Sequence, residues 1–145
     1  MSDIIKKAAL VSVIVMGLVG NTWGGWFTFE PNIVLLNGTA VGLEFKDIQK
    51  ETAYKKTGET TKAVQLVQEE KVYIIKTGAD QTRVEYISHK EYQGSIFVRV
   101  QDESGTKIWA NMLGIACKGQ DGKERSVTEQ DLAKGKFEPL SKEML

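Results

Sequence analysis

Residues 96–112 carry the clearest structural signal in the chain, and they read IFVRVQDESGTKIWANM. Apolar residues occupy every second position on both sides of a polar centre. This period of two is typical of a β-strand, whose successive side chains point to opposite faces of the sheet. The segment Glu103-Ser104-Gly105 suits a tight turn that closes on a glycine bulge. The sequence therefore predicts a β-hairpin. Its apolar positions are Ile96, Val98 and Val100, then Ile108, Ala110 and Met112.

Shorter runs of β-branched and aromatic residues predict further strands on either side of this hairpin. Asn37-Gly38 separates two of these runs and is a strong signal for a type I′ hairpin. The part of the chain after the second run is weakly patterned. There we expect a turn around Gly58, and a short helix over 44–54 is the alternative to strand. The predicted strands are 33–36, 41–46, 62–67, 72–76, 83–88, 96–101 and 107–117.

One short helix is predicted near the C-terminus. Ser126 and Glu129 stand three residues apart, as in a capping box, and Gly135 offers a C-terminal stop. The tail 136–145 either docks onto the domain or a partner, or forms a loosely ordered terminus. The predicted fold class is mainly β. We expect an N-terminal transmembrane or signal helix, then a small antiparallel β-barrel or sandwich of the SH3-like or OB-like type, with this one helix after it.

The N-terminal region has the features of a membrane-inserting segment. Residues 8–29 contain no charged side chain, and Lys6 and Lys7 stand immediately before them. A helix needs about 20 apolar residues to cross ~30 Å of hydrocarbon. The lysines favour a cytoplasmic N-terminus, so residues 1–7 are predicted in the cytoplasm, 8–29 in the membrane and 30–145 outside the cytoplasm as a β-rich domain. The predicted interface residues are Lys6, Lys7, Trp23, Trp26 and Phe27.

A cleaved signal peptide is the alternative, and it would leave a secreted domain in the same extracytoplasmic space. The best cleavage site places Thr22 and Gly24 at the −3 and −1 positions, which is a poor match to the usual small-residue pattern. We therefore favour the anchor. On a helix, spacings of four, three and four residues would put small side chains on one stripe, where another membrane helix can approach closely. The residues of this predicted helix-packing stripe are Val13, Gly17, Gly20 and Gly24.

Composition excludes several classes of function. The chain has 19 Lys and Arg and 19 Asp and Glu among its 145 residues, so its formal charge is zero and nucleic acid is not an expected partner. Cys117 is the only cysteine, which excludes an internal disulfide, and we expect it to pack in a strand. His89 is the only histidine and has no neighbouring ligand, so no metal is expected.

We also expect no cofactor, no catalytic residues and no enzymatic activity, because the sequence contains no nucleophile elbow, phosphate loop, zinc-protease motif or dinucleotide fingerprint. The carboxylate pairs Glu69-Glu70 and Asp102-Glu103 lie in polar turns and are predicted to be solvated. Tyr86 and Trp109 are candidates for a shallow ligand groove, although aromatic residues on strands more often form core or cross-strand pairs.

These observations support a non-enzymatic structural or accessory subunit of a membrane-associated assembly. Its expected partners are the lipid bilayer and the helices of other membrane proteins, or further copies of the same chain. One alternative is an extracytoplasmic binding module for a cell-wall, glycan or peptide ligand. Another is a membrane-associated structural protein of a virus or phage.

Overall fold

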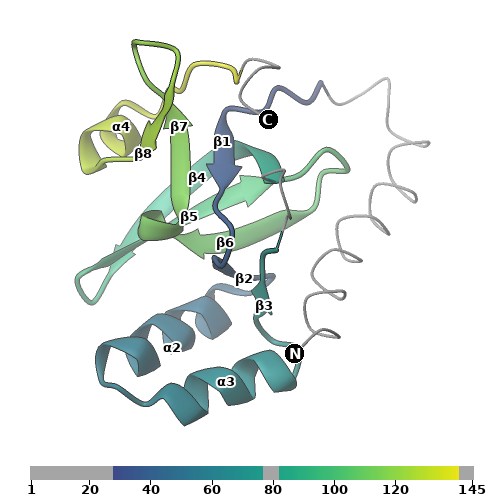
Figure 1. Ribbon diagram of the computed structural model, residues 1–145, viewed down its shortest axis with the longest axis vertical. Coiled ribbons are helices and arrows are strands. Elements are labelled where there is room, and N and C mark those ends of the chain that lie inside the picture. Colours follow the sequence, from purple (N-terminus) through teal and green to yellow (C-terminus); the bar gives the residue numbers. More distant parts are fainter. Residues whose placement is uncertain (1–27, 77–81, 141–145) are drawn as a thin grey trace.

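The computed structural model of the chain describes residues 28–76 and 82–140. Figure 1 shows one antiparallel sheet that curls into a half-barrel, with two helices packed together beside one end and a short third helix at the other. The order of the eight strands across the sheet is β3-β2-β6-β5-β4-β1-β7-β8. The predicted mainly β class and the short C-terminal helix are therefore confirmed.

The elements follow one another along the chain as strands with a helical insertion. The strands are β1 (Ile33–Leu35), β2 (Ala40–Gly42), β3 (Tyr73–Ile74), β4 (Thr82–Tyr92), β5 (Ser95–Gln101), β6 (Lys107–Asn111), β7 (Ile115–Lys118) and β8 (Glu124–Ser126). The helices are α2 (Phe45–Lys56), α3 (Thr60–Gln68) and α4 (Glu129–Lys134), and a single 3-10 turn, η1 (Met112–Gly114), lies between β6 and β7.

The predicted hairpin of β5 and β6 is confirmed, with Gly105 at a φ of +89° in its turn. The prediction that Asp102 is solvated is wrong, because this residue is only 8% exposed. Its Oδ1 atom accepts hydrogen bonds from the backbone N–H groups of Ser104 and Thr106, both at 3.0 Å. An aspartate that bonds the backbone two residues ahead is a common turn device. Asp102 therefore holds this turn closed.

The predicted pairing of the first two strands is wrong. A turn forms at Asn37-Gly38, with the Thr39 N–H donating to the Leu36 carbonyl at 3.1 Å, but only Gly38 has a positive φ, so the turn is not of type I′, and the strands on either side diverge. β1 pairs with β4 and β7, whereas β2 pairs with β3 and β6. All three residues of β1 are buried, so this strand needs neighbours and cover on both faces. A two-stranded hairpin at the edge would not provide them.

The predicted strand over 62–67 is also wrong, since these residues belong to α3, and the helical alternative for 44–54 is confirmed by α2. Ala63 and Leu66 of α3 are buried and three residues apart, which is a helical spacing. β2 ends at Gly42, where α2 packs closely against the strand. A Cβ at Gly42 would lie 3.0 Å from a side-chain carbon of Ile48.

The predicted strand over 107–117 is interrupted by η1, and 72–76 contributes only the two residues of β3 to the sheet. The break has a local cause. Asn111 accepts a hydrogen bond from the Leu113 N–H through its side chain at 2.9 Å, which starts the 3-10 turn. Before η1 the chain forms β6, which pairs with β2, and after η1 it forms β7, which pairs with β1.

Two of the three clusters of buried apolar side chains lie on opposite faces of the sheet, and the third contains Val34, Ala116 and Leu140. We call the first the inner cluster; its buried members are Ile33, Leu35, Val41, Ile75, Val84, Val98, Val100, Ala110, Ile115, Cys117, Val127 and Leu132. The second, the helix-side cluster, joins the sheet to α2 and α3; it contains Ala40, Ile48, Leu66, Val72 and Phe97, with Phe45, Tyr54, Val67, Ile74 and Trp109 partly buried around them. Cys117 packs as predicted, and burial raises the pKa of its thiol.

The C-terminal helix begins two residues later than predicted. Its capping box is formed by Thr128 and Asp131 rather than by Ser126 and Glu129. Gly135 ends the helix in the left-handed conformation, as predicted. The following tail docks onto the domain as far as it is described: Leu140 is buried, and its N–H donates to the Pro31 carbonyl at 2.9 Å.

Most of the predicted membrane segment lies outside the described residues. This holds for the stripe of Val13, Gly17, Gly20 and Gly24 and for all the predicted interface residues, from Lys6 to Phe27. In the ranges 28–76 and 82–140, no helix combines the length and the apolar character that a membrane crossing requires.

Candidate binding cleft

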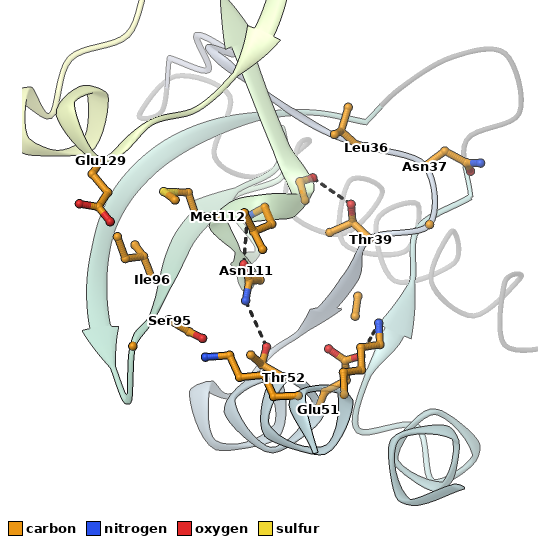
Figure 2. Close-up of a pocket in the computed structure, with 17 residues that line it drawn as sticks. Leu36, Asn37, Thr39, Glu51, Thr52, Ser95, Ile96, Asn111, Met112 and Glu129 are labelled. Carbon is orange, nitrogen blue, oxygen red and sulfur yellow. Dashed lines mark hydrogen bonds and ion pairs between the residues drawn. The ribbon is translucent and has the colours of Figure 1, made fainter. Parts of the chain in front are cut away.

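A cleft of about 630 Å³ lies where β6 ends, between α2 and the mouth of the half-barrel. Four segments far apart in the sequence form its walls: 36–40, the second half of α2, the start of β5, and 111–114 (Figure 2). The cleft also joins the two clusters, because Ile96 and Met112 pack against the inner one while Ala40 belongs to the helix-side one. Its volume is in the range of pockets that take small ligands or short segments of a partner.

Asn111 connects the two long walls of the cleft. Its Oδ1 atom accepts from the Leu113 N–H, and its Nδ2 atom donates to the Thr52 hydroxyl of α2 at 3.3 Å. Thr52 and Lys56 are one turn apart on α2, so both face this cleft. The amide of Asn111 is thus held in one orientation by both of its ends.

The opposite wall is closed by a tight approach of two backbone segments. The Gly114 carbonyl accepts hydrogen bonds from the Thr39 hydroxyl at 2.8 Å and from the Leu36 N–H at 3.0 Å. A Cβ at Gly114 would lie 2.5 Å from the methyl group of Thr39, which is shorter than any allowed contact. Glycine is therefore required at 114, because the approach of the two segments leaves no space for a side chain.

Charged groups line the cleft unevenly. Glu51 is buried and pairs with Lys55 at 2.6 Å, so these two charges compensate each other. The Lys56 ammonium lies 3.5 Å from the Gln93 carbonyl oxygen, next to the start of β5. Within the described ranges, no ion pair engages Lys56 or Glu129. Figure 2 shows Glu129, Ile96 and Ser95 following one another along one side, with Glu129 at the end away from α2.

The apolar part of the cleft is aliphatic. Leu113 of η1 lies at the edge of the cleft and is 84% exposed, more than any other large apolar side chain in residues 28–76 and 82–140. Exposed leucines are costly to leave in water when several apolar groups adjoin, and such surfaces often mark contact sites. The aliphatic lining residues are Leu36, Ala40, Ile96, Met112 and Leu113.

The structure does not bring the two predicted groove residues together. Tyr86 packs against the inner cluster, with its ring centroid 5.0 Å from that of Phe137, and burial raises the pKa of its hydroxyl. Trp109 belongs to the helix-side cluster on the other face of the sheet and lies 5.2 Å from Phe45. Neither residue lines the cleft. His89 lies in β4, where its Nδ1 atom is 2.7 Å from the Tyr86 hydroxyl oxygen.

Trp109 instead takes part in a surface of aromatic rings and cations. Lys90 stands 3.9 Å above the Phe45 ring, and the guanidinium of Arg99 is 5.7 Å from the Trp109 ring. Tyr92 packs edge-on against Phe45 at 5.9 Å and remains exposed. Cations over aromatic faces contribute about 0.5–1 kcal/mol at exposed sites.

The cleft residues were not recognised from the sequence. Thr52 and Lys56 both face the cleft because residues 45–56 form a helix. The sequence predicted a helix there only as the alternative to a strand. Asn111 had a detectable signal, since asparagine followed by a short turn at the end of a strand favours an N-cap. In the part of the chain that the structure describes, no three His, Cys, Asp or Glu side chains gather into a metal-binding group.

Comparison with known proteins found no matching family model, no matching curated protein and no matching solved structure. Function is therefore inferred from the residues of this chain alone.

Proposed function

We propose that this chain is a non-enzymatic, membrane-anchored accessory subunit whose β-rich domain holds a partner protein in the cleft beside α2. The cleft is the observation that carries the proposal. It combines an aliphatic floor with a few hydrogen-bonding groups held in fixed orientations, which is the usual composition of a binding site. The narrower fold assignment, an SH3-like or OB-like barrel, belongs to the same proposal.

The membrane anchor rests on the sequence. The uncharged segment 8–29 follows Lys6 and Lys7, so the N-terminus is in the cytoplasm and the domain from residue 30 onward is on the other side. In this arrangement the stripe of Val13, Gly17, Gly20 and Gly24 packs against a helix of the partner, and the cleft provides a second contact outside the membrane. Two linked contacts raise the overall affinity without making either of them strong.

A second candidate function is supported by the surface around Trp109. The rings of Phe45, Tyr92 and Trp109, with Lys90 and Arg99 beside them, offer flat apolar faces and positive charge. A glycan or cell-wall polymer that carries acidic groups would suit this surface. The chain would then be a binding module rather than a subunit.

Site-specific cross-linking in native membranes tests the proposal. A photoreactive amino acid is placed at Leu113 on the cleft, at Tyr92 on the aromatic surface, or at Lys123 on the exposed turn between β7 and β8. We expect one protein to be cross-linked in high yield from Leu113 and not from Lys123. Mass spectrometry of the recovered chain should find its N-terminal residues intact in the membrane fraction.

Other results would contradict the proposal. Equal yields from Leu113 and Lys123 would mean that the cleft is not the contact site. A cross-linked polysaccharide from Tyr92 alone would favour the binding module. Recovery of a chain that starts near residue 25 in the soluble fraction would remove the anchor and support secretion.

A further inference from the structure

The cleft has a polar end that is rich in hydrogen-bond donors. Thr52 and Lys56 of α2 face it, Asn111 is bonded to Thr52, and Lys56 lies beside the Gln93 carbonyl, two residues before Ser95. An ammonium has three N–H donors and no acceptor, an amide nitrogen has two N–H donors, and each hydroxyl adds one O–H donor. Only one of the two Nδ2 hydrogens of Asn111 is used by Thr52. This end of the cleft therefore favours a ligand group that accepts several hydrogen bonds.

The end of the β5–β6 ladder adds a backbone donor to the same place. The last pair of the ladder is Phe97 with Asn111, although β5 starts at Ser95. Gln93 and Gly94 both have positive φ and form a two-residue turn closed by Tyr92 and Ser95. Backbone groups of alternate residues point to opposite sides of a strand, so the Ile96 N–H points away from β4, toward the side of β6 and the turn 112–114, which also lines the cleft. The register contains no Ile96–Met112 pair to supply its acceptor.

Charge and shape then define the ligand. Lys55 neutralises Glu51 at 2.6 Å, so the charge of Lys56 makes the polar end of the cleft positive. Glu129 lies at the opposite end of the cleft, beyond Ser95 and Ile96 (Figure 2). An anionic group is attracted to the first end and repelled from the second. Next to Ser95, the side chains of Ile96 and Met112 provide an aliphatic surface.

We infer that the cleft binds the C-terminal end of a partner polypeptide, with the terminal carboxylate at Lys56 and an aliphatic side chain against Ile96 and Met112. The inference rests on the proposed function and specifies the contact that the partner makes. A carboxylate has two oxygens that accept about four hydrogen bonds, which matches the donors of Lys56, Ser95 and Asn111. The Ile96 N–H is placed to bind a backbone carbonyl of the same segment, as in the capture of peptide termini by other domains.

The test uses random peptides displayed with free C-termini and selected on the full-length chain in lipid nanodiscs. The selected sequences are synthesised in two forms that differ only in having a C-terminal carboxylate or a C-terminal amide. We expect the amide to bind about tenfold more weakly, because it loses the charge and one acceptor. Lys56→Gln should weaken the carboxylate form about tenfold and leave the amide form unchanged. Lys123→Gln, which removes a charge far from the cleft, should change neither.

Two results would overturn the inference. One is a selected peptide whose acid and amide bind equally well, or whose affinity is unchanged by Lys56→Gln. The other is the absence of any selected peptide. In both cases a partner that still cross-links at Leu113 would leave the proposed function intact and exclude only the terminal carboxylate as its binding element.

Discussion

The two faces of the sheet are built from different side chains. The inner cluster is almost entirely aliphatic, and six of its members, including Leu35 and Val98, have no exposed surface. The helix-side cluster is smaller and contains aromatic rings that reach the surface beside Lys90 and Arg99. Because hydrophobic stabilisation scales with the apolar area removed from water, the inner face should contribute most of the stability. The helix side contributes the walls of the cleft and an exposed surface.

The division follows from the alternation along single strands. In β5, Val98 and Val100 point to the inner cluster, whereas Phe97 points to the helix side. One strand therefore connects a sealed core with a surface that can contact other molecules.

The largest effect should come from truncating the same residue type on each face. Leu35 and Leu66 are both buried, at 0% and 6% exposure, the first in the inner cluster and the second on α3. Leu→Ala costs about 2–5 kcal/mol, depending on how far the surroundings collapse into the cavity. We expect Leu35→Ala near the upper limit, because the strands around it are fixed by ladders, and Leu66→Ala near the lower limit, because α3 can shift. Urea unfolding of each variant measures both values.

Leu113→Ala is the matched control for these substitutions, since this leucine is almost fully exposed. Its cost should stay within about 0.5 kcal/mol. If Leu66→Ala destabilised the chain as much as Leu35→Ala, the two faces would be equally rigid, and the contrast between them would be lost. A large effect of Leu113→Ala would mean that this residue is covered in solution.

A smaller effect is expected at the junction of the two faces, where Gly114 approaches Thr39. Gly114→Ala would put a methyl group 2.5 Å from the Thr39 side chain and force the wall of the cleft apart. Such overpacking costs about 1–3 kcal/mol. Combining it with Thr39→Ala removes the obstructing methyl group, so the double variant should be less destabilised than the sum of the single ones. Strictly additive costs from thermal unfolding would show that the close approach is not the cause.

Some elements of the fold are easier to predict from the sequence than others, for physical reasons. β4, β5 and β6 were recognised because each alternates between a sealed and a less covered face, which gives the period of two. β1 is buried on both faces, so its pattern indicates a strand but not its neighbours. α2 and α3 are short and have polar residues on most of their surface, and their few buried residues did not distinguish helix from strand.

The cleft was beyond prediction for a different reason. Its polar end is assembled from Thr52, Ser95 and Asn111, which are distant in sequence, and the hydrogen bond between Asn111 and Thr52 exists only because β6 ends next to α2. Tyr86 and Trp109 were proposed for a groove because they are aromatic residues on strands. Side chains alternate between the two faces of a strand, so Tyr86 and Trp109 can face opposite sides of the sheet. Only the register of strand pairing shows that they do.

The smallest effect should appear where α4 closes the inner face through Leu132. Asp131 accepts two hydrogen bonds from Arg125, at 2.6 and 2.7 Å, and further bonds from Thr128. The Arg125 guanidinium is the main cause that holds the pKa of the Asp131 carboxyl well below its usual range, and the bonds from Thr128 add to it. The unfolded carboxyl has a pKa of about 3.9, so the stabilisation is complete above that pH and is lost as the pH falls through the lower pKa of the folded state.

Melting temperatures of the wild type and of Asp131→Asn should therefore differ by a constant amount between about pH 5 and pH 8, and approach each other progressively as the pH falls below about 4. Because Arg125 is 44% exposed, screening limits the difference to about 1 kcal/mol or less. Arg125→Gln should remove the larger part of this pH dependence and leave the smaller part that comes from the bonds of Thr128. A difference that stayed constant down to pH 2 would mean that the charge of Asp131 contributes nothing, and that α4 is held on the inner face by Leu132 and its cap alone.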